Sequence, residues 1–303
     1  MTLSSNQIKA RGTQAEQLVE RLMLLLKQFA GFRASPQIQR KLERIFHNPS
    51  DLTDFIRAVE KDTTKTELMA LVEDLTNHET YFFRERAHLD AMEHVVLPAL
   101  IQKKQQQSGT KKIIIWSAAC ATGEEAYTLT MLALNTLLKL GVGKETTPGD
   151  ITLPADWKLE VLGTDISRQA VRIAKDAMYS SRTEGLSSFR QFPQEYMRFF
   201  DETDSKPGGD RKNYRIKPSV TRHTRFDLFN LMSAIPPQRE IDIIFCRNVL
   251  IYMDSESQNL IIRSLNQAMQ SGGSLMLSLV DSMVVPDLFR ENRQNRCVIY
   301  EKL

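Results

Sequence analysis

Cysteine is scarce in this sequence: Cys120, Cys246 and Cys297 lie far apart and form no disulfide or metal-ligand pattern. That scarcity favours a reducing compartment. Long apolar runs are also missing, since none approaches the roughly 20 residues of a membrane span, and we find no signal peptide. The five histidines are scattered and give metal catalysis no support. We therefore expect a soluble cytoplasmic protein that inserts into no membrane and holds no metal.

Several sequence motifs of other enzyme classes are absent as well. The chain has no Gly-x-x-x-x-Gly-Lys-Ser/Thr phosphate loop and no Gly-x-Ser-x-Gly nucleophile turn. His78-Glu79 is not followed by the second histidine of a zinc-protease helix. Neither sign of charge is in large excess, because 40 basic residues face 37 acidic ones, and this balance gives no indication of a nucleic-acid partner. These absences argue against P-loop, α/β-hydrolase and zinc-protease chemistry.

What the sequence does contain is enough apolar material for one large domain and a small companion, since 42% of its residues are hydrophobic. In the first part of the chain, apolar residues recur at helical spacing. The stretches with this spacing are 18–29, 38–46, 52–59 and 68–75. They predict a small all-helical N-terminal domain at residues 1–76.

From residue 113 onward, strand-like and helix-like stretches alternate. The predicted strands are 113–116, 159–164, 219–226, 241–246, 274–280 and 296–302. Such alternation is typical of a mostly parallel sheet with crossover helices. The last strand is expected to return antiparallel at the edge of the sheet. Residues 77–303 are therefore predicted to form an α/β domain.

The stretch Ile113–Glu125 passes from an apolar strand through small residues into a helical pattern. An open α/β sheet presents a nucleotide-like ligand at a turn of this kind. Ala118, Ala119 and Ala121 stand where a dinucleotide fingerprint would have glycines. By itself, the turn indicates only that some ligand approaches the backbone closely.

Polar groups follow the predicted strands at the points where the strands end. They include Glu125, Asp165, Asp227 and the pair Arg247-Asn248. Because the carboxyl ends of parallel strands share one edge, we expect these side chains to meet in one crevice. Asp165 is placed to accept hydrogen bonds from ribose hydroxyls, and Asp227 from an adenine amino group. The same logic serves nicotinamide dinucleotides and S-adenosylmethionine.

The segment Thr80–Glu85 contains three consecutive aromatic residues next to Arg84. These residues do not fit one amphipathic helix face. The segment is either a buried junction between the two domains or part of a binding site. The residue pattern alone favours the junction.

Four segments together are similar to one known family. They are Thr80-Tyr-Phe-Phe-Arg-Glu85, Trp116–Glu125, Gly163-Thr-Asp-Ile-Ser167 and Ile244–Tyr252. In their order and spacing the chain resembles the CheR-type chemoreceptor glutamate methyltransferases, which use S-adenosylmethionine. The resemblance implies a class I, Rossmann-like methyltransferase sheet with an antiparallel C-terminal edge strand, preceded by the helical domain. It also implies a small inserted β-subdomain at about 204–219, which in the family contributes to docking on the receptor.

The resemblance further implies roles for individual residues. Arg84, Arg247 and Tyr252 would face the reacting carboxylate. The implied cofactor contacts are His78, Thr80, Arg84, Ala118, Gly123, Glu125, Asp165, Asp227, Leu228, Arg247 and Asn248. The implied reaction converts glutamate side chains in the cytoplasmic domains of chemoreceptors to γ-methyl esters for sensory adaptation, leaving S-adenosylhomocysteine. We expect a monomer.

The chain departs from the family pattern at several positions. His78 stands where asparagine is usual, Asp227-Leu228 where Asn-Leu is common, and Ser278-Leu-Val-Asp281 where a Gly-His-Ser-Glu-like turn is expected. The N-terminal domain also lacks a concentrated basic helix. These departures concern the substrate more than the cofactor. Two alternatives remain open: a non-catalytic cofactor-binding scaffold of a chemosensory array, and a methyltransferase of a signalling protein outside motility.

Overall fold

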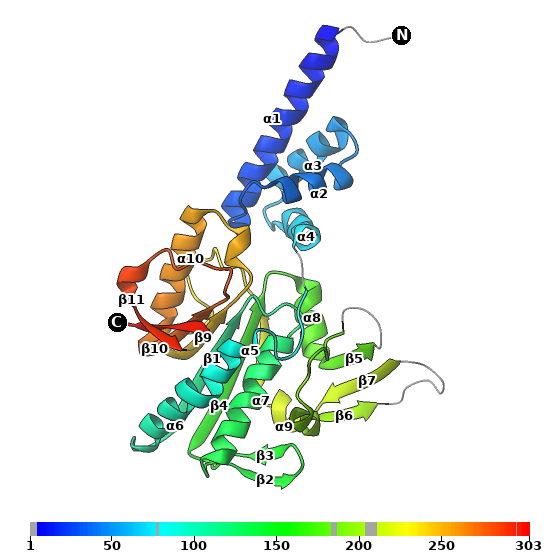
Figure 1. Ribbon diagram of the computed structural model, residues 1–303. Helices are drawn as coiled ribbons and strands as arrows, with labels where there is room; N and C mark the ends of the chain where they lie inside the picture. Colours follow the sequence, from blue (N-terminus) through cyan, green and yellow to red (C-terminus); the bar gives the residue numbers. More distant parts are fainter. Residues whose placement is uncertain (1–4, 77–78, 183–186, 204–210, 295) are drawn as a thin grey trace.

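The computed structural model describes residues 5–76, 79–182, 187–203, 211–294 and 296–303. Its first part contains the helices α1 (Ser5–Ala30), α2 (Pro36–Ile45), α3 (Pro49–Lys61) and α4 (Thr66–Leu75). Both α2 and α3 begin with proline, and the side chains of Ser35 and Asn48 cap them by accepting from the amides of Ile38 and Asp51. The four helices bury a core of their own, and α1 projects well beyond the other three (Figure 1).

The main sheet has seven strands in the order β11-β12-β10-β9-β1-β4-β8. Their bounds are β1 (Lys111–Ala118), β4 (Trp157–Asp165), β8 (Thr224–Leu228), β9 (Ile241–Cys246), β10 (Met269–Leu277), β11 (Phe289–Gln294) and β12 (Cys297–Lys302). The five strands from β10 to β8 are parallel, and β12 is antiparallel to β10. The predicted mostly parallel sheet with an antiparallel C-terminal edge is confirmed. Beyond β12 the sheet gains one further antiparallel strand, β11, which the sequence did not predict.

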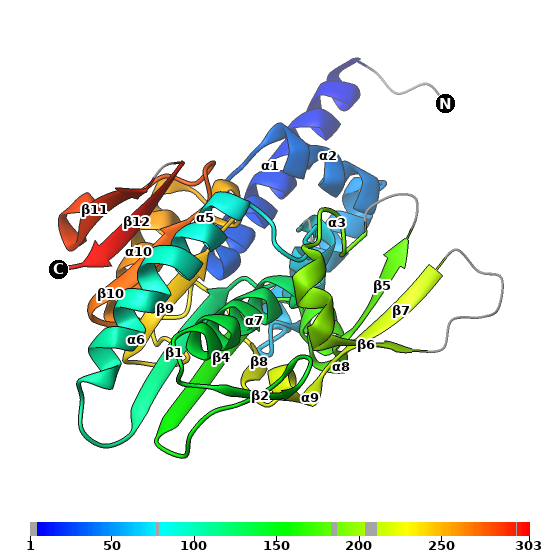
Figure 2. The same cartoon turned by 60° about the horizontal axis from the view of Figure 1, so that its bottom comes forward.

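Helices cover both faces of this sheet. On one face lie α5 (Arg86–Ala91), the π-helical turn η1 (Met92–Val96), α6 (Leu97–Gln105), α7 (Glu124–Lys139), α8 (Arg168–Asp176) and α9 (Pro218–Thr221). On the other face lies α10 (Ser255–Ala268). Figure 2 shows α6 and α7 side by side over the strands. Among the described residues, no helix combines the length and the apolar character that a membrane span requires.

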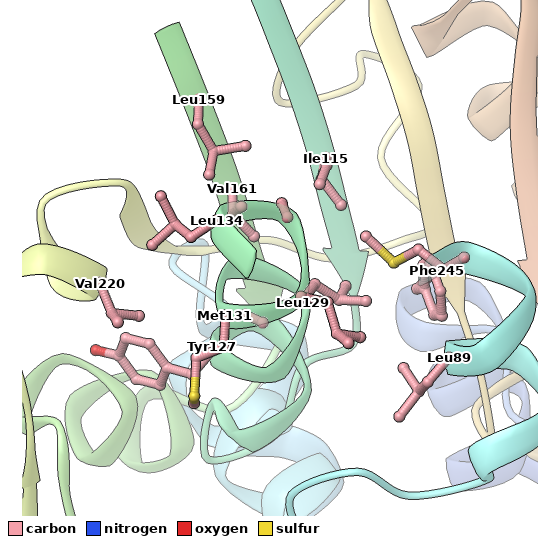
Figure 3. Packing of buried hydrophobic residues seen from close by; sticks show 14 of the residues in the cluster. Leu89, Ile115, Tyr127, Leu129, Met131, Leu134, Leu159, Val161, Val220 and Phe245 are labelled. Carbon is pink, nitrogen blue, oxygen red and sulfur yellow. The ribbon is translucent and has the colours of Figure 1, made fainter. Parts of the chain in front are cut away.

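The central strands are buried on both faces, so their sequences are continuous apolar runs rather than alternating ones. On the α7 face, Leu129 and Leu134 belong to the same buried cluster as Ile115 of β1, Val161 of β4 and Phe245 of β9 (Figure 3). On the α10 face, a second cluster fills the space between helix and sheet. This double burial fixes the strand register and therefore determines which residues emerge at the carboxyl edge.

Two small antiparallel sheets lie beside the main one. A hairpin joins β2 (Lys144–Thr147) to β3 (Asp150–Thr152), and a three-stranded sheet has the order β5-β7-β6. Its strands are β5 (Met178–Arg182), β6 (Phe200–Thr203) and β7 (Arg211–Ile216). Of these, only β7 falls in the predicted range 204–219, and residues 204–210 of that range lie outside the described residues.

The helical domain contacts the α/β domain through the chain that follows α1. Phe32 forms an antiparallel bridge with Met253, and the Arg33 amide donates to the Tyr252 carbonyl at 2.9 Å. The Asp254 amide returns a bond to the Gly31 carbonyl at 3.1 Å. The end of α1 is thereby attached to the loop that follows β9.

Candidate active site

A cavity lies at the carboxyl edge of the main sheet, under the helical domain. The helical domain supplies one wall through Ala30, Phe32, Val72 and Thr76. The opposite wall comes from the loops that follow the parallel strands β1, β4, β8 and β9. The convergence of strand ends expected from the sequence is therefore observed.

The floor of the cavity is the turn between β1 and α7. Ala119 and Ala121 adopt left-handed backbone conformations, with φ of 67° and 47°, and both line the cavity. The Asp165 carboxylate stabilises this turn, because its Oδ2 accepts from the Ala121 amide at 2.8 Å while its Oδ1 accepts from the Ser167 amide at 2.9 Å. Asp165 is only 6% exposed and lines the same cavity. The Asp165 carboxylate therefore holds the backbone that follows both β1 and β4, and it also lines the cavity.

A buried ion pair joins three parts of the chain beside this floor. The Arg247 Nε donates to Glu125 Oε2 at 2.7 Å, and its Nη1 donates to the Arg84 carbonyl at 3.0 Å. The other oxygen of Glu125 accepts from the Ser117 hydroxyl at 2.7 Å. The side chains of Arg247 and Glu125 are 1% and 13% exposed. The guanidinium is thus held in place by partners on α7 and on the segment before α5.

The loop after β9 is held from the other side by Asp281. Its carboxylate accepts from the amides of Asn248 and Ile251, at 2.9 and 3.1 Å, and from the Ser278 hydroxyl at 2.6 Å. Burial raises the pKa of the Asp281 carboxyl, which these hydrogen bonds oppose. Asn248 also donates from its side chain to Glu85 Oε1 at 2.9 Å. The loop that carries Tyr252 to the cavity is therefore fixed along much of its length.

The segment before α5 was predicted to be either a junction between the two domains or part of a binding site. Phe82 and Phe83 are buried and pack edge-on against aromatic rings that include Tyr179 and Phe192, so they belong to the core on the α7 face of the α/β domain and not to the contact with the helical domain. Thr80 and Arg84 line the cavity instead. The backbone turns between these residues, with left-handed φ angles of 59° at Phe83 and 56° at Glu85, and this turn lets one short stretch both fill the core and line the cavity.

The predicted site residues divide into two groups. Those that line the cavity are Thr80, Arg84, Glu125, Asp165, Arg247, Asn248 and Tyr252. Those absent from the described lining are Ala118, Gly123, Asp227 and Leu228. His78 lies outside the described residues. Asp227 instead pairs with Arg225 at 2.6 Å on the exposed surface, and Leu228 is 44% exposed.

Sequence reasoning missed Phe229, Asn230 and Leu231, which do line the cavity. The available signal was the Asn-Leu dipeptide, which occurs three residues after Asp227. Because β8 continues to Leu228, the first residues free to cross the sheet edge come after it. Asn230-Leu231 thus occupies the place in the cavity that was expected for Asp227-Leu228.

Gly123 contributes to the site through packing and not through the cavity lining. It precedes α7 with φ of 96°, and a Cβ there would lie 2.7 Å from the Ala174 Cβ and 3.1 Å from Phe226 Cζ. We expect Gly123→Ala to lower the free energy of unfolding by about 2–4 kcal/mol, because left-handed strain and overpacking add. Urea denaturation of the purified variant measures this.

Gly141 provides the matched control for that substitution. Its φ is 73°, but a Cβ there would meet nothing within 4 Å. Gly141→Ala should therefore cost only about 1 kcal/mol, the backbone share of the penalty. An equal decrease in the free energy of unfolding of both variants would show that overpacking around Gly123 adds nothing to the backbone penalty.

The sequence matches known proteins over most of its length. The profile of the CheR methyltransferase S-adenosylmethionine-binding domain matches residues 78–298. A chemotaxis protein methyltransferase of Borreliella burgdorferi is 28% identical over 75% of this chain and 72% of its own. Chemotaxis protein methyltransferase 1 of Pseudomonas aeruginosa is 29% identical over 76% of each chain, and the enzyme of Vibrio parahaemolyticus 29% over 83% and 82%. The chain belongs to the CheR methyltransferase family, and its cofactor is S-adenosylmethionine.

Proposed function

We propose that this enzyme methylates glutamate side chains in the cytoplasmic domains of chemoreceptors, forming γ-methyl esters. The names of its relatives support the substrate class, since they are chemotaxis protein methyltransferases. The observation that carries the reaction type is the composition of the cavity. Among its described lining residues there are side-chain donors such as Arg84 and Tyr252 but no histidine. A glutamate with a reference pKa of about 4.3 is already ionised at neutral pH, so it needs no general base.

The cavity has the chemistry that the cofactor requires. Asp165 offers carboxylate oxygens at the floor, where ribose hydroxyls would donate to them. The side chains of Ile166, Phe229 and Leu231 supply apolar walls for a flat ring, and Asn230 adds an amide among them. The small residues of the β1–α7 turn allow the backbone to approach the ligand. We propose that these residues hold S-adenosylmethionine, with Asn230-Leu231 in place of Asp227-Leu228.

The chain's own residues have three tasks in the transfer. When bound, S-adenosylmethionine supplies an electrophilic methyl group on a cationic sulfonium. Arg84 and Tyr252 orient the glutamate carboxylate, whose negative charge is lost as the ester forms. Donors that held the carboxylate tightly would stabilise the ground state and slow transfer, so placement in a dry cavity contributes more than attraction. Arg247 acts through its partners, because Glu125 and the Arg84 carbonyl already occupy its Nε and Nη1.

A methyl-transfer assay tests this function directly. Purified enzyme is incubated with tritium-labelled S-adenosylmethionine and the cytoplasmic fragments of chemoreceptors from the same source. We expect label on receptor glutamates that alkali releases as methanol. A folded enzyme that binds S-adenosylhomocysteine but labels no receptor would contradict the proposal. Label on another signalling protein would reassign the substrate, and cofactor binding without any transfer would indicate a scaffold.

Asn230 gives a specific test of the cofactor site. Its amide nitrogen donates to the Phe29 carbonyl at 2.6 Å, and its oxygen accepts from the Met232 amide at 3.0 Å. We expect Asn230→Ala to raise the Kd for S-adenosylhomocysteine about 10-fold, since a ligand contact and a domain contact are both lost. Asp227→Ala should leave the Kd within about 2-fold, because the lost partner is only an exposed arginine. If calorimetry shows a larger increase in Kd for Asp227→Ala than for Asn230→Ala, the cofactor contact is Asp227 and not Asn230.

A further inference from the structure

The turn after β10 exposes two large aliphatic side chains. Leu279 and Val280 are 67% and 63% exposed, whereas Ser278 before them is 4% exposed. Among the described residues, they are the one adjacent pair of large exposed apolar side chains. Single exposed aliphatic residues are ordinary, but a fixed pair on a tight turn contributes nothing to the core and gains from a partner. We refer to Leu279 and Val280 as the 279–280 lip.

The lip lies beside the active-site loop. Leu277 of β10 pairs with Cys246 of β9 in the parallel ladder, so the two strands end side by side. Strand β9 continues into the loop that carries Asn248 and Tyr252, and β10 continues into the lip. Asp281 then ties the turn to that loop through the Asn248 amide. The distance between lip and cavity is therefore fixed by the fold.

The turn that carries the lip is also rigid. The Asp281 amide donates to the Ser278 carbonyl at 3.2 Å, and the Ser278 hydroxyl donates to Asp281 Oδ2 at 2.6 Å. These bonds close the turn on both sides of the exposed pair. A rigid apolar surface binds a partner with a small loss of conformational entropy, because it is already in its bound shape.

The surroundings of the lip indicate the charge of the partner. A surface hollow beside Leu279 is lined by Arg293, Arg296 and Tyr300, and also by Asp281, whose carboxylate already accepts from Ser278 and from the Asn248 amide. Arg293 pairs with Glu291 at 2.7 Å, whereas Arg296 has no ion-pair partner among the residues that the structure describes. An apolar pair next to a free cation suits an acidic segment that carries an apolar side chain.

We propose that the 279–280 lip contacts an apolar side chain that neighbours the methyl-accepting glutamate of the substrate. This inference rests on the proposed function, because the glutamate must enter the adjacent cavity while its neighbours remain at the mouth. A second copy of this chain fits less well. Stable protein interfaces bury about 800 Å² per partner, far more than two aliphatic side chains provide. A substrate that is bound and released in each turnover needs only a small patch.

Kinetics of the double variant Leu279→Ser/Val280→Ser test the proposal. We expect the KM for a receptor cytoplasmic fragment to rise about 10-fold, with kcat and the Kd for S-adenosylhomocysteine unchanged, because only apolar burial at the mouth is lost. The conservative variant Leu279→Met/Val280→Ile should keep the KM within about 2-fold. Leu303→Ser is the matched control. Leu303 is 62% exposed and lies two residues after Glu301, which pairs with Ser274 of β10 and not with the carboxyl end of that strand.

The outcomes separate this inference from the function on which it rests. If the wild-type enzyme labels the receptor and the double variant has the same KM, the inference is wrong and the function stands. If the wild-type enzyme labels no receptor, both are wrong. If sedimentation shows a wild-type dimer that the double variant dissociates, the lip binds a second copy and not the substrate. Thermal unfolding of each variant confirms that it is folded.

Discussion

Arg247→Met should lower kcat/KM for methyl transfer by about 100-fold or more, the largest effect we expect from a single substitution in this protein. The substitution leaves Glu125 with only the Ser117 hydroxyl as a partner and removes the donor to the Arg84 carbonyl. Breaking a buried ion pair by removing one partner typically costs about 3–5 kcal/mol. Part of this free-energy cost will appear as a lower free energy of unfolding. The variant will reduce the rest by shifting the segment that carries Arg84, which lowers activity. Labelled-methyl kinetics together with urea denaturation measure the two parts.

A second variant separates charge from geometry at this ion pair. In Arg247→Met/Glu125→Gln the carboxylate at the shorter of the two Arg247 ion pairs is neutralised, and only the longer pair with Glu85, at 3.5 Å, stays broken. Stability should therefore recover by about half or more of the loss. Activity should stay low if Arg247 is needed to position the segment before α5. The positioning role is contradicted if the affinity for S-adenosylhomocysteine falls by as large a factor as the rate of methyl transfer. That outcome would make Arg247 a cofactor contact and not a residue that positions Arg84.

Asp165→Ala should raise the Kd for S-adenosylhomocysteine by about 100-fold, because hydrogen bonds to a charged group are worth about 1.5–3 kcal/mol and several are lost together. Besides its proposed ribose contact, the carboxylate holds the Ala121 amide and the Ser167 amide. The β1–α7 turn would lose the partner that stabilises its left-handed residues. Titration calorimetry of the purified variant gives the affinity.

Ser167→Ala is the control for the structural share of that effect. The Ser167 hydroxyl accepts from the Ala170 amide at 3.0 Å and caps α8, but it leaves the Asp165 carboxylate untouched. Loss of such a cap costs about 1 kcal/mol of stability. We expect cofactor affinity to remain within about 2-fold in this variant, since the carboxylate stays in place. A Kd for Asp165→Ala no higher than that of the control would refute the proposed ribose contact.

The parts of the fold that repeat a simple pattern could be predicted from the sequence. The amphipathic period identified α2 to α4 and the part of α1 from residue 18 onward, and the apolar runs identified the parallel strands. Because parallel strands end at one edge, the sequence also predicted that Glu125, Asp165 and Arg247 meet, and all three line the cavity. Strand β11 was missed because an edge strand buries little, and most of its residues are polar. Its sequence carries no strand signal that stands out from a loop.

The position of Asp227 outside the described cavity lining has a different cause. The predicted strand 219–226 ended two residues too early, whereas β8 continues to Leu228. Because successive residues of a strand face opposite sides, a shift of one or two positions changes which side chain reaches a site. The Phe229 amide donates to the Asp165 carbonyl at 2.9 Å, and only after this bond does the chain cross the sheet edge. No local signal reports such a long-range bond.

The bridge between Phe32 and Met253 has a consequence for the exchange of cofactor and product. The cavity has the helical domain on one side and the strand ends on the other, so a ligand in it contacts both. A separation of the two domains that widened this cavity would break the bonds between them, which include those to Tyr252 and Gly31 and the bond from Asn230 to the Phe29 carbonyl. A ligand that binds only the closed arrangement stabilises it by about 2.7 kcal/mol at 100 times its Kd. The frequency with which this enzyme opens would therefore depend on how much S-adenosylmethionine and S-adenosylhomocysteine surrounds it.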